Sequence, residues 1–159
     1  MPLILLHTKI AAPIERCFDL ARSMEVHVLS MQASGERIVE GRKSGLIEVN
    51  ETVTFRAKHF GITQELTGKI SEMSRPYFFV DTMVSGAFKS LSHRHVFMQK
   101  GQDTMMKDEF YYASPFGVFG KIADALFLKK YLVHILSERN SFIKNCAEGD
   151  GWKNILQNS

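Results

Sequence analysis

The chain has 159 residues, which is enough for one domain with a sizeable core. Hydrophobic residues make up 45% and charged residues 23%, as in ordinary soluble domains, and the formal net charge is +3. Because this small charge is scattered along the chain, we expect no nucleic-acid partner. No run approaches the roughly 20 apolar residues that span a bilayer, and the first residues lack a signal-peptide pattern, so we expect a cytoplasmic protein without stable membrane insertion.

Motifs for cofactors, metals and covalent catalysis are missing from the sequence. The two cysteines, Cys17 and Cys146, lie near opposite ends of the chain without CxxC or Cys/His spacing, which favours reduced thiols. The sequence has no glycine-rich phosphate loop, Ser-His-Asp order or nucleophile elbow. We therefore expect no cofactor and no metal.

The chain begins with a strand and two short helices. Residues 3–10 are rich in β-formers and alternate weakly, which predicts a strand. Pro13 stands at a first helical position and is followed by apolar residues at helical spacing, which predicts a helix over 13–21. Ser23 is a suitable N-cap for a second helix over 24–31.

Six further strands follow, ending before Pro115. Alternating apolar and polar residues predict them at 36–40, 48–58, 62–73, 77–84, 88–99 and 104–112. Glycines stand in several of the short connections, so we expect hairpins and antiparallel pairing.

A long C-terminal helix is predicted over about 118–146, with a length of about 45 Å. One apolar stripe carries the prediction: Phe119, Ile122, Ala123, Leu126, Tyr131 or Leu132, Ile135, Leu136, Phe142, Ile143 and Cys146. Gly149 and Gly151 follow its end, and we expect a loose tail beyond them. The chain is thus divided into a single domain, 1–147, and a C-terminal tail, 148–159.

The order of elements predicts an α+β fold. One helix cannot cover a flat sheet of seven strands, so we expect a curved antiparallel sheet wrapped around the long helix. The space between sheet and helix would then form a cavity, and the two short helices between the first and second strands would close one end.

The chain resembles the START-like (SRPBCC) superfamily, which has the helix-grip fold and includes Bet v 1-like proteins, polyketide cyclases and lipid-transfer domains. It looks most like small bacterial ligand-binding members whose functions are not established. The resemblance rests on Pro13 with Cys17-Phe18-Asp19-Leu20, Arg75-Pro76 before Phe79 and Asp81, Gly86-Ala87-Phe88-Lys89, His93-Arg94-His95 with Phe97, the strand 104–112 before Pro115, and Arg139.

This resemblance covers residues 3–147 and implies a central hydrophobic cavity. It implies no shared catalytic residues, because the superfold hosts carriers, cyclases, hydrolases and sensors. One position departs from the pattern, since relatives often carry Gly-Pro-Phe where this chain has Gly86-Ala87-Phe88.

Ionisable side chains share a sheet face with apolar ones in the last two strands. His93 and His95 alternate with Ser92 and Arg94, and they lie on the face of Leu91 and Phe97. Buried polar groups cost free energy unless they are paired, so this face predicts a pocket wall.

Asp108 belongs to the neighbouring strand, on the face of Met106, Phe110 and Tyr112. A two-residue turn at Gly101-Gln102 places Asp108 opposite His95, within reach of a cross-strand pair. A carboxylate in that position favours proton binding by the imidazole and fixes its tautomer.

Two other acids are harder to place. Both faces of the strand 77–84 are apolar, so alternation does not orient Asp81, although the resemblance favours Asp81 as a site residue near His93. Glu51 fits either a pocket acid or a charge at a strand end. The ligand-binding set that we predict is Phe79, Asp81, Leu91, His93, His95, Phe97, Met106, Asp108, Phe110 and Tyr112.

The His95–Asp108 pair has three roles open to it. It could hold a closed core together, orient the polar end of a mostly apolar ligand, or serve acid–base chemistry, with Asp81 as an alternative partner. A metal held by His93, His95 and a carboxylate is the remaining option. The two histidines supply two ligands where zinc needs three or four, and spacing places no third histidine.

We therefore expect a binding protein for a small hydrophobic or amphipathic ligand, such as a lipid, an isoprenoid or an aromatic polyketide. The alternatives are a cyclase- or hydrolase-type enzyme and a non-catalytic regulatory or interaction module. Whether the protein is an enzyme, and whether it forms a homodimer, the sequence leaves open.

Overall fold

The computed structural model describes residues 2–115, 117–123 and 127–159. Its elements are β1 (Leu3–Ile10), α1 (Ile14–Ala21), α2 (Met24–Ser30), a 3-10 turn (Gln32–Ser34), β2 (Arg37–Gly41), β3 (Thr52–His59), β4 (Ile62–Ser74), β5 (Phe78–Ser85), β6 (Ser90–Lys100), β7 (Asp103–Ala113), α3 (Gly117–Ala123), α4 (Lys129–Glu148) and α5 (Gly151–Leu156). Each strand that the sequence predicts is confirmed, with ends shifted by a few residues. Ser23 caps α2 as expected, since its hydroxyl accepts from the Val26 amide.

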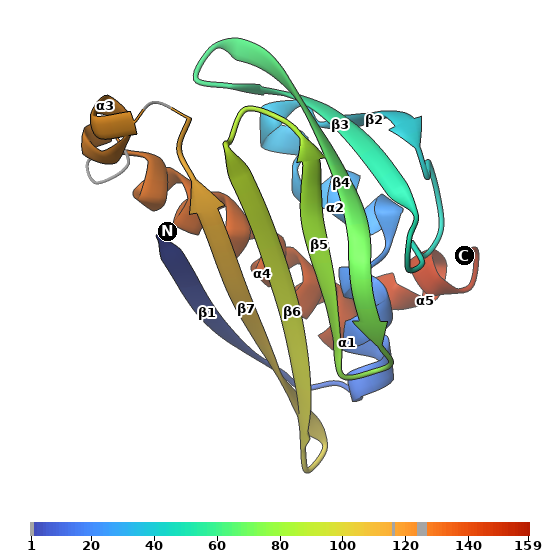
Figure 1. Ribbon diagram of the computed structural model, residues 1–159. Coiled ribbons are helices and arrows are strands. Elements are labelled where there is room, and N and C mark those ends of the chain that lie inside the picture. The colour runs from blue at the N-terminus through green and yellow to red at the C-terminus, as the bar shows by residue number, and fades with distance from the viewer. Residues whose placement is uncertain (1, 116, 124–126) are drawn as a thin grey trace.

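The described strands form one antiparallel sheet of seven in the order β1-β7-β6-β5-β4-β3-β2. This sheet curves around α4, and α1 and α2 lie on the same side as α4 (Figure 1). The α+β helix-grip architecture is therefore confirmed. No described helix combines the length and hydropathy that crossing a bilayer requires.

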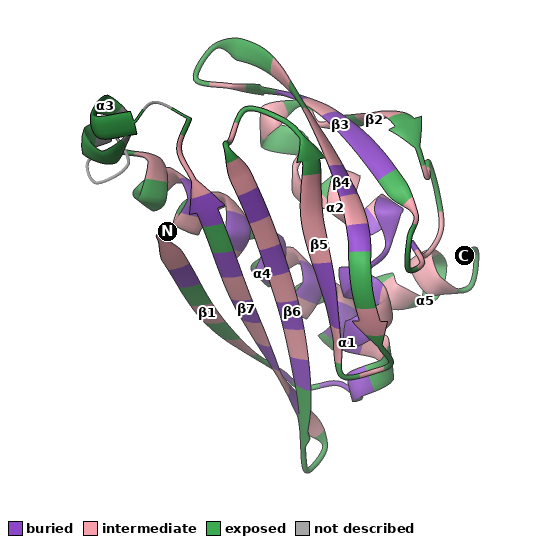
Figure 2. Ribbon diagram, viewed as in Figure 1, coloured by how far each residue is buried: buried purple, intermediate pink, exposed green. Residues whose placement is uncertain are grey.

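Strand register follows from the tight turn between β6 and β7. Gly101 adopts a positive φ of 64° there, and Lys100 pairs with Asp103 across it. His95 consequently lies opposite Asp108, which confirms the register expected from the sequence. Buried and less buried residues alternate along both strands (Figure 2), as the period of two requires.

Among the described residues, two groups of buried apolar side chains form the core. One lies under α1, where Phe18 meets Phe79 and Phe97 edge to face, with ring centroids 5.6 and 5.5 Å apart. The other joins β6, β7 and α4 through residues such as Leu91 and Leu136.

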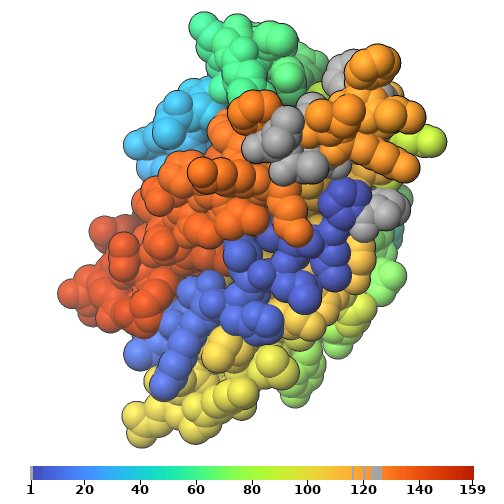
Figure 3. Space-filling view, turned by 90° about the vertical axis from the view of Figure 1, so that its left-hand side faces the viewer, coloured from blue at the N-terminus to red at the C-terminus, as the bar shows by residue number. Residues whose placement is uncertain are grey.

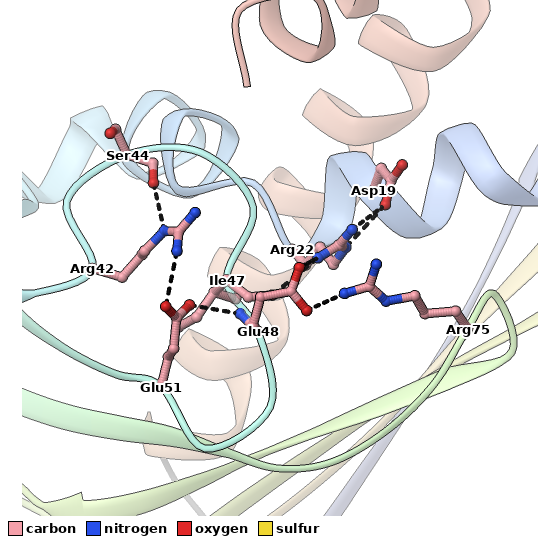
Figure 4. Close-up of polar contacts among 8 residues, drawn as sticks. All are labelled: Asp19, Arg22, Arg42, Ser44, Ile47, Glu48, Glu51 and Arg75. Atoms are coloured by element: carbon pink, nitrogen blue, oxygen red, sulfur yellow. Dashed lines mark hydrogen bonds and ion pairs between the residues drawn. The ribbon is translucent and has the colours of Figure 1, made fainter.

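Ion pairs and hydrogen bonds hold the loop between β2 and β3 in place (Figure 4). The buried guanidinium of Arg22 contacts the carboxylates of Asp19 and Glu48, and Glu48 also pairs with Arg75. Glu51 accepts from Arg42 and from the Glu48 amide, each at 2.8 Å. Of the two roles that the sequence allowed Glu51, the structure thus supports the charge at a strand end.

The apolar stripe predicted from residue 118 is wrong at its beginning. Phe119 and Ile122 lie on α3, where they are 84% and 55% exposed, because α3 sits beyond the end of the sheet (Figure 1). From α4 onward the stripe is buried at Leu132, Leu136 and Ile143. Residues 124–126, which include the predicted Leu126, lie outside the described residues.

The loose conformation expected beyond Gly151 is also wrong, because Gly151–Leu156 form α5. Trp152, Ile155 and Leu156 pack against the core under α1, and the Arg16 guanidinium lies 3.9 Å from the centre of the Trp152 ring. These apolar residues recur at helical spacing, which explains why the segment docks as a helix.

Candidate functional site

A cavity of about 430 Å³ lies between the sheet, α2 and α4. Its wall is mostly aliphatic and aromatic and includes Phe55, Ile70, Leu91 and Leu136. Phe60 and Phe127 also line it, although they are 64% and 68% exposed. The cavity therefore opens to solvent beside the β3–β4 turn and the beginning of α4.

Two histidines of the wall form a polar cluster with a carboxylate that is fully buried. His93 Nε2 lies 2.8 Å from Asp108 Oδ1, and His95 Nδ1 lies 3.0 Å from the same oxygen. The two imidazole rings are 3.7 Å apart between centroids. From α4, Asn140 Nδ2 donates to Asp108 Oδ2 at 2.6 Å, so Asp108 joins the sheet to the helix.

Burial and hydrogen bonding fix the charges of this cluster. Burial alone would raise the pKa of Asp108, but contacts from His93 and His95 outweigh it and hold that pKa well below its usual range. Burial lowers the pKa of His95 well below its ordinary value, and the nearby His93 lowers it further. At neutral pH the cluster therefore contains an ionised Asp108 and a neutral His95, and His93 Nε2 donates to the carboxylate.

Arg139 on α4 brings a buried guanidinium to the cavity wall. Its Nη2 donates to the Ala21 carbonyl at 2.7 Å, while its Nη1 has no hydrogen-bond partner among the described residues. Burial lowers the pKa of Arg139, and the acids Asp108 and Asp81 oppose that shift. A buried donor without a partner carries a free-energy cost that a bound acceptor would relieve.

Asp81 lies opposite His93 on the neighbouring strand and lines the cavity. Burial raises its pKa, although His93 and Arg139 oppose the shift. Gly68 on β4 leaves room for this side chain, because a Cβ atom there would stand 2.6 Å from Asp81 Oδ1.

A second polar group lies nearer the opening. The imidazole of His27 on α2 stacks on Phe55, with centroids 4.1 Å apart, and its Nε2 lies 2.5 Å from Glu36 Oε1. His59 Nδ1 and the Tyr131 hydroxyl are hydrogen-bonded at 2.6 Å. All five of these side chains line the cavity.

Six of the ten predicted site residues lie in the cavity wall: Phe79, Asp81, Leu91, His93, His95 and Phe110. The other four, Phe97, Met106, Asp108 and Tyr112, are fully or almost fully buried and are not part of the wall. Alternation finds the correct face of a strand, but it does not tell where α1 or α4 covers that face.

Sequence reasoning missed the helix residues of the site. The sequence pattern points to neither His27 on α2 nor His59 at the end of β3 as a site residue. Arg139 and Asn140 fall at helical spacing among the buried residues Leu136 and Ile143. Polar residues inside an apolar stripe are the signal that could have found these two.

Three ligand atoms in the cluster suit a metal by distance. Those of His93, His95 and Asp108 lie within 4.8 Å of one another, so Asp108 is the carboxylate that would complete a set of three ligands. However, His93 and Asp108 already face each other as hydrogen-bond donor and acceptor, and a cation would have to break that bond. The arrangement thus fits a polar contact at least as well as a metal ligand set.

No family model matches the sequence, and no curated protein matches it. Solved structures do resemble the fold. A Thermus thermophilus protein is 18% identical with a TM-score of 0.69 over 89% of this chain and 97% of its own. Ginseng major latex-like protein 151 from Panax ginseng is 15% identical with a TM-score of 0.67 over 93% and 98%.

A START superfamily protein from Mycobacterium smegmatis is 13% identical, with a TM-score of 0.69 over 92% of this chain and 97% of its own. At these identities the likeness establishes the fold alone. It confirms that the chain has the START-like, Bet v 1-like fold that the sequence resembles.

Proposed function

We propose that the protein binds a small, mostly apolar ligand with one polar end in the cavity between the sheet and α4. The observation that carries this proposal is an apolar cavity of about 430 Å³ that reaches solvent. Ligand pockets commonly enclose roughly 300–1,000 Å³. Each Å² of apolar surface that leaves water contributes about 25 cal/mol, which favours occupation by a lipid, an isoprenoid or an aromatic polyketide.

The polar side chains of the wall give the ligand an orientation. The unpartnered Arg139 Nη1 favours an acceptor such as a carbonyl or carboxyl oxygen. Asp81, whose pKa is raised by burial, is suited to donate a hydrogen bond in its protonated form. Polar wall groups of this kind fix orientation, while the apolar wall supplies most of the affinity.

Filling the cavity tests the proposal. Leu136→Trp adds bulk at the wall, and we expect it to weaken binding of the apolar dye ANS by about tenfold or more in a fluorescence titration. Leu29→Trp is the control, because Leu29 is 41% exposed and is not in the wall. Equal affinity in both variants, with thermal unfolding showing both folded, would contradict the proposal.

Acid–base catalysis is the second candidate, since a neutral imidazole in the wall stands 3.0 Å from an ionised carboxylate. The lowered pKa of His95 makes it a weak base near neutral pH, which is why we favour binding. A hydrolysis and cyclisation screen comparing wild type with His95→Ala decides the matter. Turnover that vanishes in the variant would support an enzyme, and equal turnover would exclude this site.

We further propose that the protein works in the reducing cytoplasm. Cys17 and Cys146 are both free thiols. Burial raises the pKa of each, which favours the unreactive protonated form.

A further inference from the structure

Large apolar side chains are concentrated at one end of the molecule. Among the described residues, eight such side chains are more than half exposed, and seven of them lie at this end. We call these seven the mouth patch: Phe60, Ile62, Val84, Val118, Phe119, Ile122 and Phe127. The eighth, Tyr77, lies between β4 and β5 at the opposite end of the sheet.

Three segments far apart in sequence build the mouth patch. They are the β3–β4 turn, the end of β5, and α3 with residue 127. Figures 1 and 3 both show the β3–β4 turn and α3 at the same end. Because Phe60 and Phe127 also line the cavity, the mouth patch borders the cavity opening.

Exposed lysines flank the mouth patch. Lys58 precedes the β3–β4 turn, Lys89 follows β5, Lys121 lies on α3, and Lys129 and Lys130 begin α4. None of these five makes an ion pair with another described residue. The nearest acid on the β3–β4 hairpin, Glu65, is already paired with Arg56.

We propose that this end of the molecule docks on the surface of a lipid bilayer that carries anionic headgroups. The apolar side chains of the mouth patch would contact the acyl chains of such a bilayer. The exposed lysines beside them would contact its negatively charged headgroups. Docking there would bring the cavity opening against lipid. This proposal does not rest on ligand binding, because it requires only the exposed surface.

A second copy of the chain fits the mouth patch less well. A symmetric dimer places the same surface on both partners, so the lysines of one copy would face those of the other. Charges of one sign at an interface repel, whereas an anionic bilayer attracts them.

Co-sedimentation with lipid vesicles tests the proposal. We expect the protein to bind vesicles of phosphatidylcholine mixed with phosphatidylglycerol, to bind those of phosphatidylcholine alone at least about tenfold more weakly, and to lose binding as salt rises. Phe119→Ser should weaken binding by about tenfold. Tyr77→Ser is the matched control, because Tyr77 is 59% exposed but lies at the opposite end.

Charge reversal gives a second pair of variants. Lys129→Glu with Lys130→Glu should reduce binding to the anionic vesicles by about tenfold or more. Lys100→Glu, at the β6–β7 turn, should leave binding unchanged.

Three outcomes would overturn the proposal: no binding to anionic vesicles, equal loss in the variants and their controls, or a wild-type dimer that Phe119→Ser turns into a monomer without vesicle binding. The ANS titration is independent of all three. Failure to dock and failure to bind a ligand are therefore distinguishable.

Discussion

At the scale of single residues, Asp108 holds the polar cluster together. One carboxylate contacts both imidazoles of β6 and accepts from Asn140 of α4. The sequence predicts the strand contact, because alternation and a two-residue turn fix which side chains face each other across β6 and β7. It does not predict the Asn140 contact, which depends on how α4 is rotated over the sheet.

Removing the Asp108 carboxylate should therefore destabilise the fold. Asp108→Ala leaves the buried donors of His93 and Asn140 without their acceptor, and we expect a loss of about 3 kcal/mol in the free energy of unfolding by denaturant. Asp103→Ala on the same strand should cost less than about 1 kcal/mol, because Lys9, its ion-pair partner, is 70% exposed. Similar losses in the two variants would count against this account.

His95 should make stability depend on pH. Its folded-state pKa lies below its unfolded value, so protonation favours the unfolded chain, and stability should fall as the pH drops below about 6.5. Asp108, whose pKa is also lowered, adds a further loss only below about 3.9. His95→Gln should flatten the decline in melting temperature between about pH 7 and 5.

The control for that experiment is His7→Gln, because His7 on β1 is exposed. This variant should keep the slope of the wild type. If the melting temperature of His95→Gln falls with pH as steeply as that of the wild type and of His7→Gln, burial does not hold His95 neutral.

At the scale of elements, the strands and the first two helices could be predicted, and the C-terminal elements only in part. Strand alternation and the Ser23 cap are local signals that the tertiary structure keeps. The exposed face of α3 could not be predicted, because apolar spacing indicates a helix without saying what covers it. The helix α5 could not be predicted either, because its few apolar residues have a core to pack against only once α1 is in place.

The packing of α5 can be tested through its one tryptophan. Trp152→Ala removes contacts with the core and with the Arg16 guanidinium, and we expect a loss of about 1–2 kcal/mol in the free energy of unfolding. Lys153→Ala, one residue further on the same helix, should change it by less than about 0.5 kcal/mol. If both variants unfold like the wild type, α5 contributes nothing to the fold.

At the scale of the whole molecule, one long helix against a curved sheet of seven strands leaves space that side chains do not fill. The cavity is expected from the order of elements, because the single helix α4 cannot cover a sheet of seven strands. Its polar lining draws on α2, β3, β4, β5, β6 and α4, together with Glu36 just before β2. These residues are too distant in sequence for periodicity to relate them. This is why His93 and His95 could be predicted and the His27–Glu36 contact could not.

A crystal structure of the protein saturated with the fatty acid decanoate tests the central claim most directly. We expect density for the acyl chain inside the cavity, with the carboxylate within hydrogen-bonding distance of Arg139 or Asp81. A cavity closed by rearranged side chains, or one that holds only water at saturating decanoate, would contradict the account.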